Sequence, residues 1–252
     1  MLLRYDDKEH KYFIDGKEVP SVTKFTGIVD KSMFLIPWAL KCAERYLISN
    51  WPSYDSVGAF EREKLFHDMK SAHKDELADA GALGTKVHEW IEQHIRAVLS
   101  LSCEPEWPLD PRGASAVEDF LEWENSHHVQ YLLSERKVYS LRMGISGTLD
   151  VLALVDRVKT LIDMKTSNGF RDDYRMQTAA YCDFYEEETQ DKIEDRLVLM
   201  LSKDDGKPTP ITLPRDTREE DLLAFENAVF LRKWKDKREK QNPIKRTKKR
   251  MG

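Results

Sequence analysis

The chain has 252 residues, of which 40% are hydrophobic and 34% charged, so it has enough apolar surface for a core and is not a mostly disordered chain. No apolar run approaches the roughly 18 residues that a membrane span requires, and the polar start MLLRYDDKEH is unlike a secretory signal. The net charge of −5 is unevenly divided, because Leu231 to Gly252 carry +9 and the preceding 230 residues carry −14. We therefore expect a cytoplasmic protein with an acidic body and a basic end that can bind a polyanion.

The three cysteines are sparse and far apart. Cys42, Cys103 and Cys182 form no C-x-x-C pair, which argues against a zinc knuckle or an iron–sulfur cluster. An odd, small number of cysteines fits a reducing cytoplasm. We expect each of them to be a small buried or half-buried residue.

The first half of the chain is expected to form a hairpin followed by helices. Asp15-Gly16 is a strong turn signal for a hairpin over Lys11–Glu18, and Pro20-Ser21 precedes a helix start. Ala80–Gly84 is expected to interrupt the helical pattern, and a loop with three prolines is expected at residues 105–111. The spacing of apolar residues predicts helices over Trp38–Ser49, Phe60–Asp79, Val87–Leu99 and Ala114–Glu124.

The second half alternates between strand and helix patterns. Strands are predicted over Val129–Tyr139, Ile145–Val155, Val158–Lys165, Arg196–Ser202 and Pro210–Leu213, and helices over Asp172–Glu187 and Asp221–Lys240. This order predicts an α/β fold with a central mixed β-sheet flanked by helices and an N-terminal helical layer. We expect one domain over residues 1–240, divided into a hairpin and helical part (1–80), a core (81–215) and a C-terminal helix (216–240), with a basic flexible tail at 241–252.

The register of one hairpin brings two acidic residues together. If the strands pair across the Asp156-Arg157 turn without slippage, Asp150 lies opposite Asp163, and Lys165 points to the same face. Two opposed carboxylates repel each other, and a divalent cation such as Mg²⁺ or Mn²⁺ explains the arrangement better than Lys165 alone. The alternative is a register shifted by one residue, with ordinary charges on an exposed face, because the turn lacks glycine.

Four motifs resemble those of the PD-(D/E)XK nuclease superfamily, in the same order. Ser146-Gly147-Thr148-Leu149-Asp150, followed by Ile162-Asp163-Met164-Lys165, is similar to the superfamily's G-x-x-D … D-x-K signature. Gly84-Thr85-Lys86-Val87-His88 and Gln177-Thr178-Ala179-Ala180-Tyr181 resemble the G-T-x-x-H and Q-x-x-x-Y helices of its RecB-like, phage-type exonuclease branch. The resemblance implies a restriction-endonuclease-like core over the motif-bearing region.

The resemblance also implies roles for individual residues. His88, Asp150, Asp163 and the main-chain carbonyl of Met164 would bind Mg²⁺, which Mn²⁺ would replace. Lys165 would be the catalytic lysine. A lone helical histidine is usually structural, but the two aspartates and the lysine favour ligation by His88.

Four further residues are assigned to the site less directly. Glu135 lies on the first predicted strand, where relatives carry an acid that assists the metal site; it could equally belong to a solvated stretch. Gln177, Tyr181 and Thr85 would contact DNA or brace the site, although a helical stripe that includes Tyr181 can also be simple packing against the sheet. The remaining histidines considered, His94, His127 and His128, are expected at the surface.

Together these features predict a metal-dependent DNA exonuclease that hydrolyses phosphodiester bonds at DNA ends in recombination, repair or phage DNA metabolism. The carboxylates would hold the ion, and Lys165 would assist the attack of water. A structure- or site-specific endonuclease on the same core and a non-catalytic DNA-binding module are the alternatives. DNA is the expected partner, with a single-strand annealing or single-strand-binding protein plausible by analogy, and neither a membrane nor an iron–sulfur cluster is expected.

Overall fold

The computed structural model describes residues 2–51, 58–99, 103–167, 169–203 and 207–241, and the chain forms two compact units. One unit comprises Met1–Val29 and Trp90–Gly252, and the other comprises Asp30–Glu89. The predicted tail at 241–252 lies outside the described residues except for Gln241. No helix in the described part of the chain is long and apolar enough to cross a membrane.

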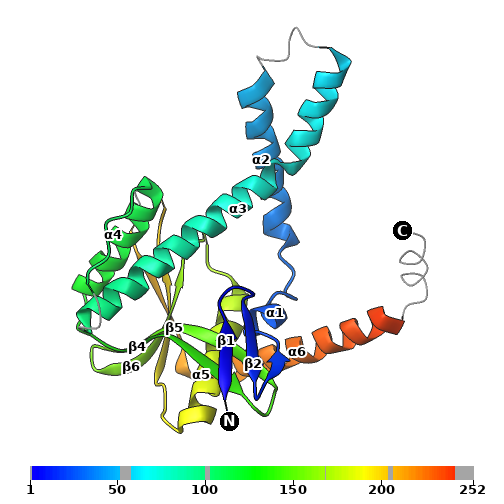
Figure 1. Cartoon of the computed structure of the whole chain (residues 1–252). Coiled ribbons are helices and arrows are strands. Elements are labelled where there is room, and N and C mark those ends of the chain that lie inside the picture. The colour runs from blue at the N-terminus through cyan, green and yellow to red at the C-terminus, as the bar shows by residue number, and fades with distance from the viewer. Residues whose placement is uncertain (1, 52–57, 100–102, 168, 204–206, 242–252) are drawn as a thin grey trace. The chain divides into compact units, whose positions relative to one another are not determined.

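The smaller unit is helical. It contains α2 (Ser32–Asn50) and most of α3 (Ala59–Val98), a single long helix that continues into the larger unit (Figure 1). Arg45 of α2 forms an ion pair with Glu76 of α3, and the ring of Trp38 meets that of His73 edge-on at 6.5 Å. Helix α2 begins at Ser32, six residues before the predicted start.

The predicted break at Ala80–Gly84 is wrong, because α3 runs through it without interruption. Alanine is the strongest helix former, and the two glycines, Gly81 and Gly84, cost only about 1 kcal/mol each, so this run does not end a helix that is otherwise favourable. The hydroxyl of Thr85 donates a 3.2 Å hydrogen bond to the carbonyl of Gly81, one turn earlier. Thr85 is therefore an interior helix residue and does not act as a cap.

The larger unit is built on a five-stranded mixed sheet with the order β4-β5-β6-β7-β8. Neighbouring strands are antiparallel except for β6 and β7, which are parallel and are joined through helix α5. Helices flank this sheet, and the predicted α/β class with a central mixed sheet is confirmed. The strands are β4 (Val129–Ser140), β5 (Ile145–Val155), β6 (Val158–Lys165), β7 (Asp195–Met200) and β8 (Thr209–Leu213).

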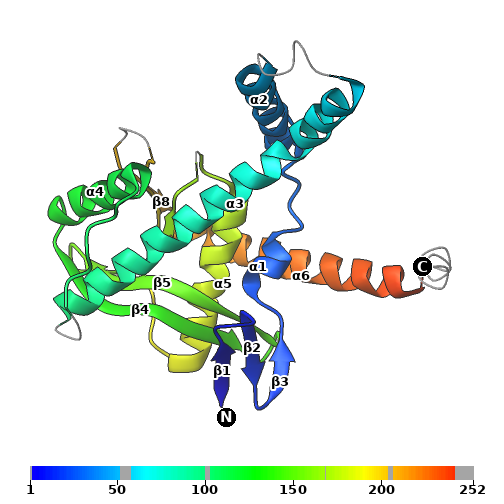
Figure 2. The same cartoon turned by 45° about the horizontal axis from the view of Figure 1, so that its top comes forward.

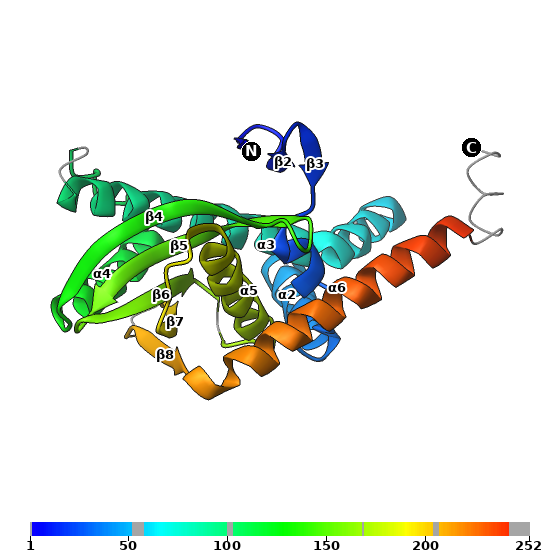
Figure 3. The same ribbon diagram turned by 90° about the horizontal axis from the view of Figure 1, so that it is seen from below.

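Helix α5 (Asp172–Thr189) packs along β4 and β5, and α6 (Arg218–Gln241), which follows the short 3-10 turn η2 (Arg215–Thr217), packs across α5 (Figure 3). The core between them includes Leu149, Leu152 and Leu161, all fully buried. Full burial of each such side chain contributes roughly 1.5–3 kcal/mol. These contacts hold β5 and β6 in place, and both strands carry side chains of the candidate active site.

Helix α4 (Pro111–Asn125) starts earlier than predicted. Asp110 accepts a 3.0 Å hydrogen bond from the Arg112 amide, and Pro111 occupies the first helical position. Proline is favoured there because its missing N–H has no partner in the first turn. The third proline of the predicted loop therefore begins the helix instead of preceding it.

A small antiparallel sheet precedes the core, with strands β1 (Leu3–Asp6), β2 (Lys11–Ile14) and β3 (Lys17–Val19). The predicted hairpin is confirmed, because β2 and β3 pair across Asp15-Gly16, both at positive φ. Ser21 then accepts from the Lys24 amide and caps α1 (Val22–Thr26). Tyr12 contacts Thr148 through their hydroxyls (2.8 Å), and Ser21 bridges to Ser146, so this sheet is anchored beside β5 (Figure 2).

Candidate active site

The hairpin of β5 and β6 has the predicted register. Its ladder runs from the Val155–Val158 pair to the Val151–Ile162 pair and ends there. One residue further on, the carboxylate of Asp150 accepts a 2.8 Å hydrogen bond from the main-chain N–H of Met164. The predicted register is therefore confirmed for the length of the ladder, and Asp150 and Asp163 lie just beyond its last pair.

Asp163 is fully buried and is paired with Lys165. Its Oδ2 lies 2.7 Å from the Lys165 ammonium, and its Oδ1 accepts a 3.3 Å hydrogen bond from the amide of Gln177. Burial raises the pKa of Asp163 to about 7; Lys165 opposes this shift and the charge of Asp150 adds to it. Burial alone would lower the pKa of Lys165, but Asp163 and Asp150 outweigh it, so that pKa is raised and the lysine stays charged.

Glu135 supplies a third carboxylate. It lies between the Ser134–Val151 and Arg136–Leu149 pairs of β4 and β5, opposite Asp150, and its backbone has a φ of 50°. A non-glycine residue in this region is strained, and such strain concentrates at functional sites. One carboxylate oxygen of Glu135 lies within 4.8 Å of one of Asp150. Burial and then the charge of Asp150 raise the pKa of Glu135 to about 8.

This donor set fits a hard divalent cation. The three carboxylates, Glu135, Asp150 and Asp163, crowd negative charge into a poorly solvated place, and two of them have raised pKa values because of it. Oxygen ligands of this kind are those that Mg²⁺ and Mn²⁺ prefer. A cation would offset the repulsion that the single ammonium of Lys165 leaves.

The main-chain carbonyl of Met164 has the direction needed for a further oxygen ligand. In a strand, the N–H and C=O of one residue point to the same side, and the N–H of Met164 points to Asp150. The carbonyl of Lys165 points the other way, because it accepts a 2.8 Å hydrogen bond from the amide of Leu201, the residue after β7. Strand geometry thus directs the Met164 carbonyl toward Asp150.

Helix α5 carries residues that contact the acidic centre, which is the cluster of Glu135, Asp150 and Asp163. Gln177 and Tyr181 are both buried, and the Gln177 amide, which donates to Asp163, also donates a 3.2 Å hydrogen bond to the Tyr181 hydroxyl. Tyr181 in turn packs on Gly147 of β5, where an added Cβ would lie 2.5 Å from its ring. These positions suit residues that hold the carboxylates in place.

Replacing Gly147 with alanine is expected to destabilise the protein by about 1–3 kcal/mol, because the new methyl group overlaps the Tyr181 ring. Thermal denaturation measures the effect. The matched control is Gly81→Ala in α3, where an added Cβ meets nothing within 4 Å and should stabilise the helix by roughly 0.5–1 kcal/mol. Equal melting temperatures for Gly147→Ala and the wild type would contradict the close packing of Tyr181.

Two predicted site residues, His88 and Thr85, belong to the other unit. Both lie on α3, where His88 is partly buried and Thr85 is exposed. The hydroxyl of Thr85 is used within its own helix. Their roles at the acidic centre remain predictions.

Two predictions about surface and burial are wrong. His94 is not a surface residue: its side chain is 12% exposed, it stacks on Trp90, and its two ring nitrogens lie 3.1 Å from Glu104 and Glu124. The hydrogen bond with Glu124 is the main reason that the pKa of His94 is raised. Cys103 is exposed, since it lies in the irregular segment before α4, whereas the other two cysteines are buried.

The motifs do not predict the aromatic neighbour of Lys165. The Lys165 ammonium lies 5.2 Å from the ring centre of Tyr174, a buried residue whose hydroxyl meets that of Ser167 at 2.8 Å. Tyr174 lies one turn before Gln177 on α5, which is the signal that could have identified it. A cation over an aromatic face is stabilised, so Tyr174 helps to fix the position of Lys165.

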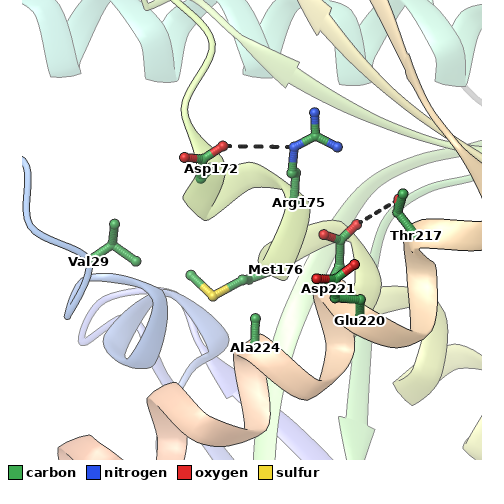
Figure 4. A pocket seen from close by; sticks show the side chains of 8 residues that line it. All are labelled: Val29, Asp172, Arg175, Met176, Thr217, Glu220, Asp221 and Ala224. Carbon is green, nitrogen blue, oxygen red and sulfur yellow. Dashed lines mark hydrogen bonds and ion pairs between the residues drawn. The ribbon is translucent and has the colours of Figure 1, made fainter.

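A separate pocket of about 420 Å³ lies where α5 and α6 begin (Figure 4). Arg175 borders it with Asp172, to which it is paired at 3.8 Å, and Thr217 donates a 3.3 Å hydrogen bond to Asp221. None of the three carboxylates of the acidic centre lines this pocket. It is therefore distinct from the candidate active site.

Comparisons with known proteins find structural likeness but no matching family or curated sequence. No family model and no curated protein sequence matches the chain. A candidate exonuclease from Eubacterium rectale superposes with a TM-score of 0.38 and 10% identity over 57% of this chain, which spans 64% of that protein. The protein SSO0001 superposes with a TM-score of 0.27 and 16% identity over 81% of this chain and 87% of its own. Likenesses of this size do not identify a function.

Proposed function

We propose that the protein is a metal-dependent deoxyribonuclease that hydrolyses phosphodiester bonds at DNA ends. The observation that carries the proposal is the clustering of Glu135, Asp150 and Asp163 beside the charged amine of Lys165. Three carboxylates in so small a volume are costly without a cation, and a lysine beside them is placed to act on a phosphate. The sequence motifs D-x-K and Q-x-x-x-Y fall on these same residues and their supports.

His88 is proposed as an additional ligand. Helix α3 is continuous, so His88 lies one turn before Glu92 on the same face. After burial and the charge of Asp150, the charge of Glu92 also raises the pKa of Glu135, and both residues belong to the larger unit. The proposal for His88 rests on its place in the G-T-x-x-H motif. An imidazole at this position would complete a mixed set of oxygen and nitrogen ligands.

A bound divalent cation supplies Lewis acidity toward the phosphate oxygens. The protein's own residues hold the ligands in position and stabilise the charge that develops on the phosphate. Asp150 and Asp163 are held by Met164 and Gln177, so they need little rearrangement to act as ligands. Lys165 keeps its positive charge and can stabilise the extra negative charge that develops on the phosphate as water attacks.

The test is digestion of end-labelled linear DNA beside a covalently closed circle, with Mg²⁺, Mn²⁺ or EDTA. Metal-dependent loss of the linear species alone supports the exonuclease, and the label position gives its polarity. Nicking of the closed circle would show that the protein is an endonuclease and not an exonuclease. If neither duplex nor single-stranded DNA is cut with either metal, the nuclease proposal fails.

Metal binding is expected to release protons near neutral pH. The pKa values of Glu135 and Asp163 are raised to about 8 and about 7, and a carboxylate must be ionised to act as a ligand. The affinity for Mn²⁺ should therefore increase as pH rises through this range. Titration calorimetry in two buffers with different ionisation enthalpies measures the number of protons released, and identical heats in both buffers would contradict the expectation.

A further inference from the structure

Arg171 lies directly before α5 and close to the catalytic lysine. Its guanidinium carbon is 4.8 Å from the ring centre of Tyr174, the same ring over which the Lys165 ammonium lies at 5.2 Å. The two cationic groups are therefore at most about 10 Å apart, a distance that one DNA strand covers in roughly three nucleotides. Tyr174 is buried and bonded to Ser167, so this shared ring is fixed in place.

Two contacts within the protein orient the guanidinium of Arg171. Its Nε lies 3.5 Å from Asp173 and its guanidinium carbon lies over the ring of Tyr174, so the described contacts involve neither of its two terminal amino groups. The side chain is 38% exposed. An arginine held in this way presents its amino groups for bidentate binding of a phosphate.

The charge of the site creates a need for such a residue. Glu135, Asp150 and Asp163 repel a DNA strand, and the charge of Lys165 is already paired with Asp163. A second cation beside the lysine would offset that repulsion where the strand enters.

We propose that Arg171 binds a backbone phosphate of the DNA strand at or next to the scissile phosphate. This inference rests on the proposed nuclease function and adds a substrate-binding residue to it. Arg171 positions the strand and takes no part in the proton transfers of hydrolysis.

Arg175 provides a matched control one turn further along the same helix. It is also an arginine over an aromatic ring, with its guanidinium carbon 5.2 Å from the centre of Phe170, and its side chain is 34% exposed. It is paired with Asp172 and borders the separate pocket of Figure 4. Loss of a surface arginine as such would affect both positions equally.

The experiment measures binding of a fluorescein-labelled oligothymidylate by anisotropy, in EDTA and in the Lys165→Ala background so that no cleavage occurs. Arg171→Ala should weaken binding about 10-fold and reduce the salt slope by about one charge, whereas Arg175→Ala should stay within about twofold of the parent. Arg171→Lys should restore part of the affinity. A series with single neutral methylphosphonate linkages should contain one position at which Arg171→Ala causes no further loss.

Equal affinity for Arg171→Ala and Arg175→Ala, or an Arg171→Ala loss that no neutral linkage removes, would overturn the inference. Failure of the inference is separable from failure of the nuclease proposal. If the wild type cuts DNA and Arg171→Ala cuts with unchanged KM and kcat, the nuclease stands and the role of Arg171 falls. If Arg171→Ala does not fold, as judged by its thermal transition, Arg171→Gln takes its place in every arm.

Discussion

Lys165→Ala is expected to lower the rate of DNA cleavage by at least about 100-fold, the cost of removing one positioned charge that stabilises a transition state. The ammonium lies 2.7 Å from Asp163 and over the ring of Tyr174, and these two contacts position its charge. Single-turnover cleavage of labelled DNA measures the loss. Binding in EDTA should change far less than the rate, because the substitution removes an interaction made with developing charge.

The matched control for this substitution is Lys159→Ala. Lys159 is on the same strand, β6, and its ammonium is paired with Asp191 at 2.6 Å, outside the candidate site. It should cut DNA at the rate of the wild type. Lys165→Ala also removes the packing of the lysine's alkyl chain, so Lys165→Met, which keeps most of that packing while removing the same charge, is measured alongside. Cleavage at the wild-type rate by a folded Lys165 variant would rule out the assigned role.

The placement of the acidic centre could be predicted from the sequence because it depends on strand register. The two-residue turn at Asp156-Arg157 sets the register of every residue pair between β5 and β6. The alternation of side chains along β6 then places Lys165 on the same face as Asp163. The two turn residues have φ values of 49° and 74°, so the turn forms without glycine. Turn geometry and side-chain alternation therefore predict which residues face each other along the whole length of a ladder.

Other features depend on tertiary contacts that no local pattern encodes. The strand β4 has a register shift between Tyr131 and Leu133 and a residue of positive φ at Glu135, and period-two alternation predicts neither. Helix α3 continues through Gly81 because two alanines flank the glycine and favour the helix. The approach of Arg171 and Lys165 to one ring depends on how the segment between β6 and α5 folds back, which the sequence does not specify.

Glu135→Gln is expected to stabilise the metal-free protein at alkaline pH while it impairs metal binding. Burial and Asp150 raise the pKa of Glu135 to about 8, so the carboxyl is neutral in the folded protein at a pH where it ionises when unfolded. The stabilisation that comes from this held proton is fully present below about pH 4.5, and it is lost as pH rises through about 8. Glutamine does not titrate, so the variant escapes this loss.

The wild type and Glu135→Gln should therefore have similar melting temperatures at pH 5, and Glu135→Gln should have the higher melting temperature at pH 9. The side chain is only partly buried and solvent screens its charge, so the gain is on the order of 1–3 kcal/mol, or roughly 3–8 °C in Tm. Glu122→Gln, an exposed position on α4, should show no such pH-dependent gain. A variant that is less stable than the wild type at pH 9 would contradict repulsion between Glu135 and Asp150.

Addition of Mg²⁺ should reverse this order. A ligand that binds only the folded state stabilises it by an amount that rises with the logarithm of its affinity, and the wild type keeps the carboxylate that the variant has lost. The wild type should therefore gain more from the metal, and the variant should cut DNA more slowly at any fixed metal concentration. A gain in stability without metal, combined with a loss of stabilisation by metal, is the result expected of a ligand and not of a structural glutamate, because a structural role would make the variant weaker in both conditions.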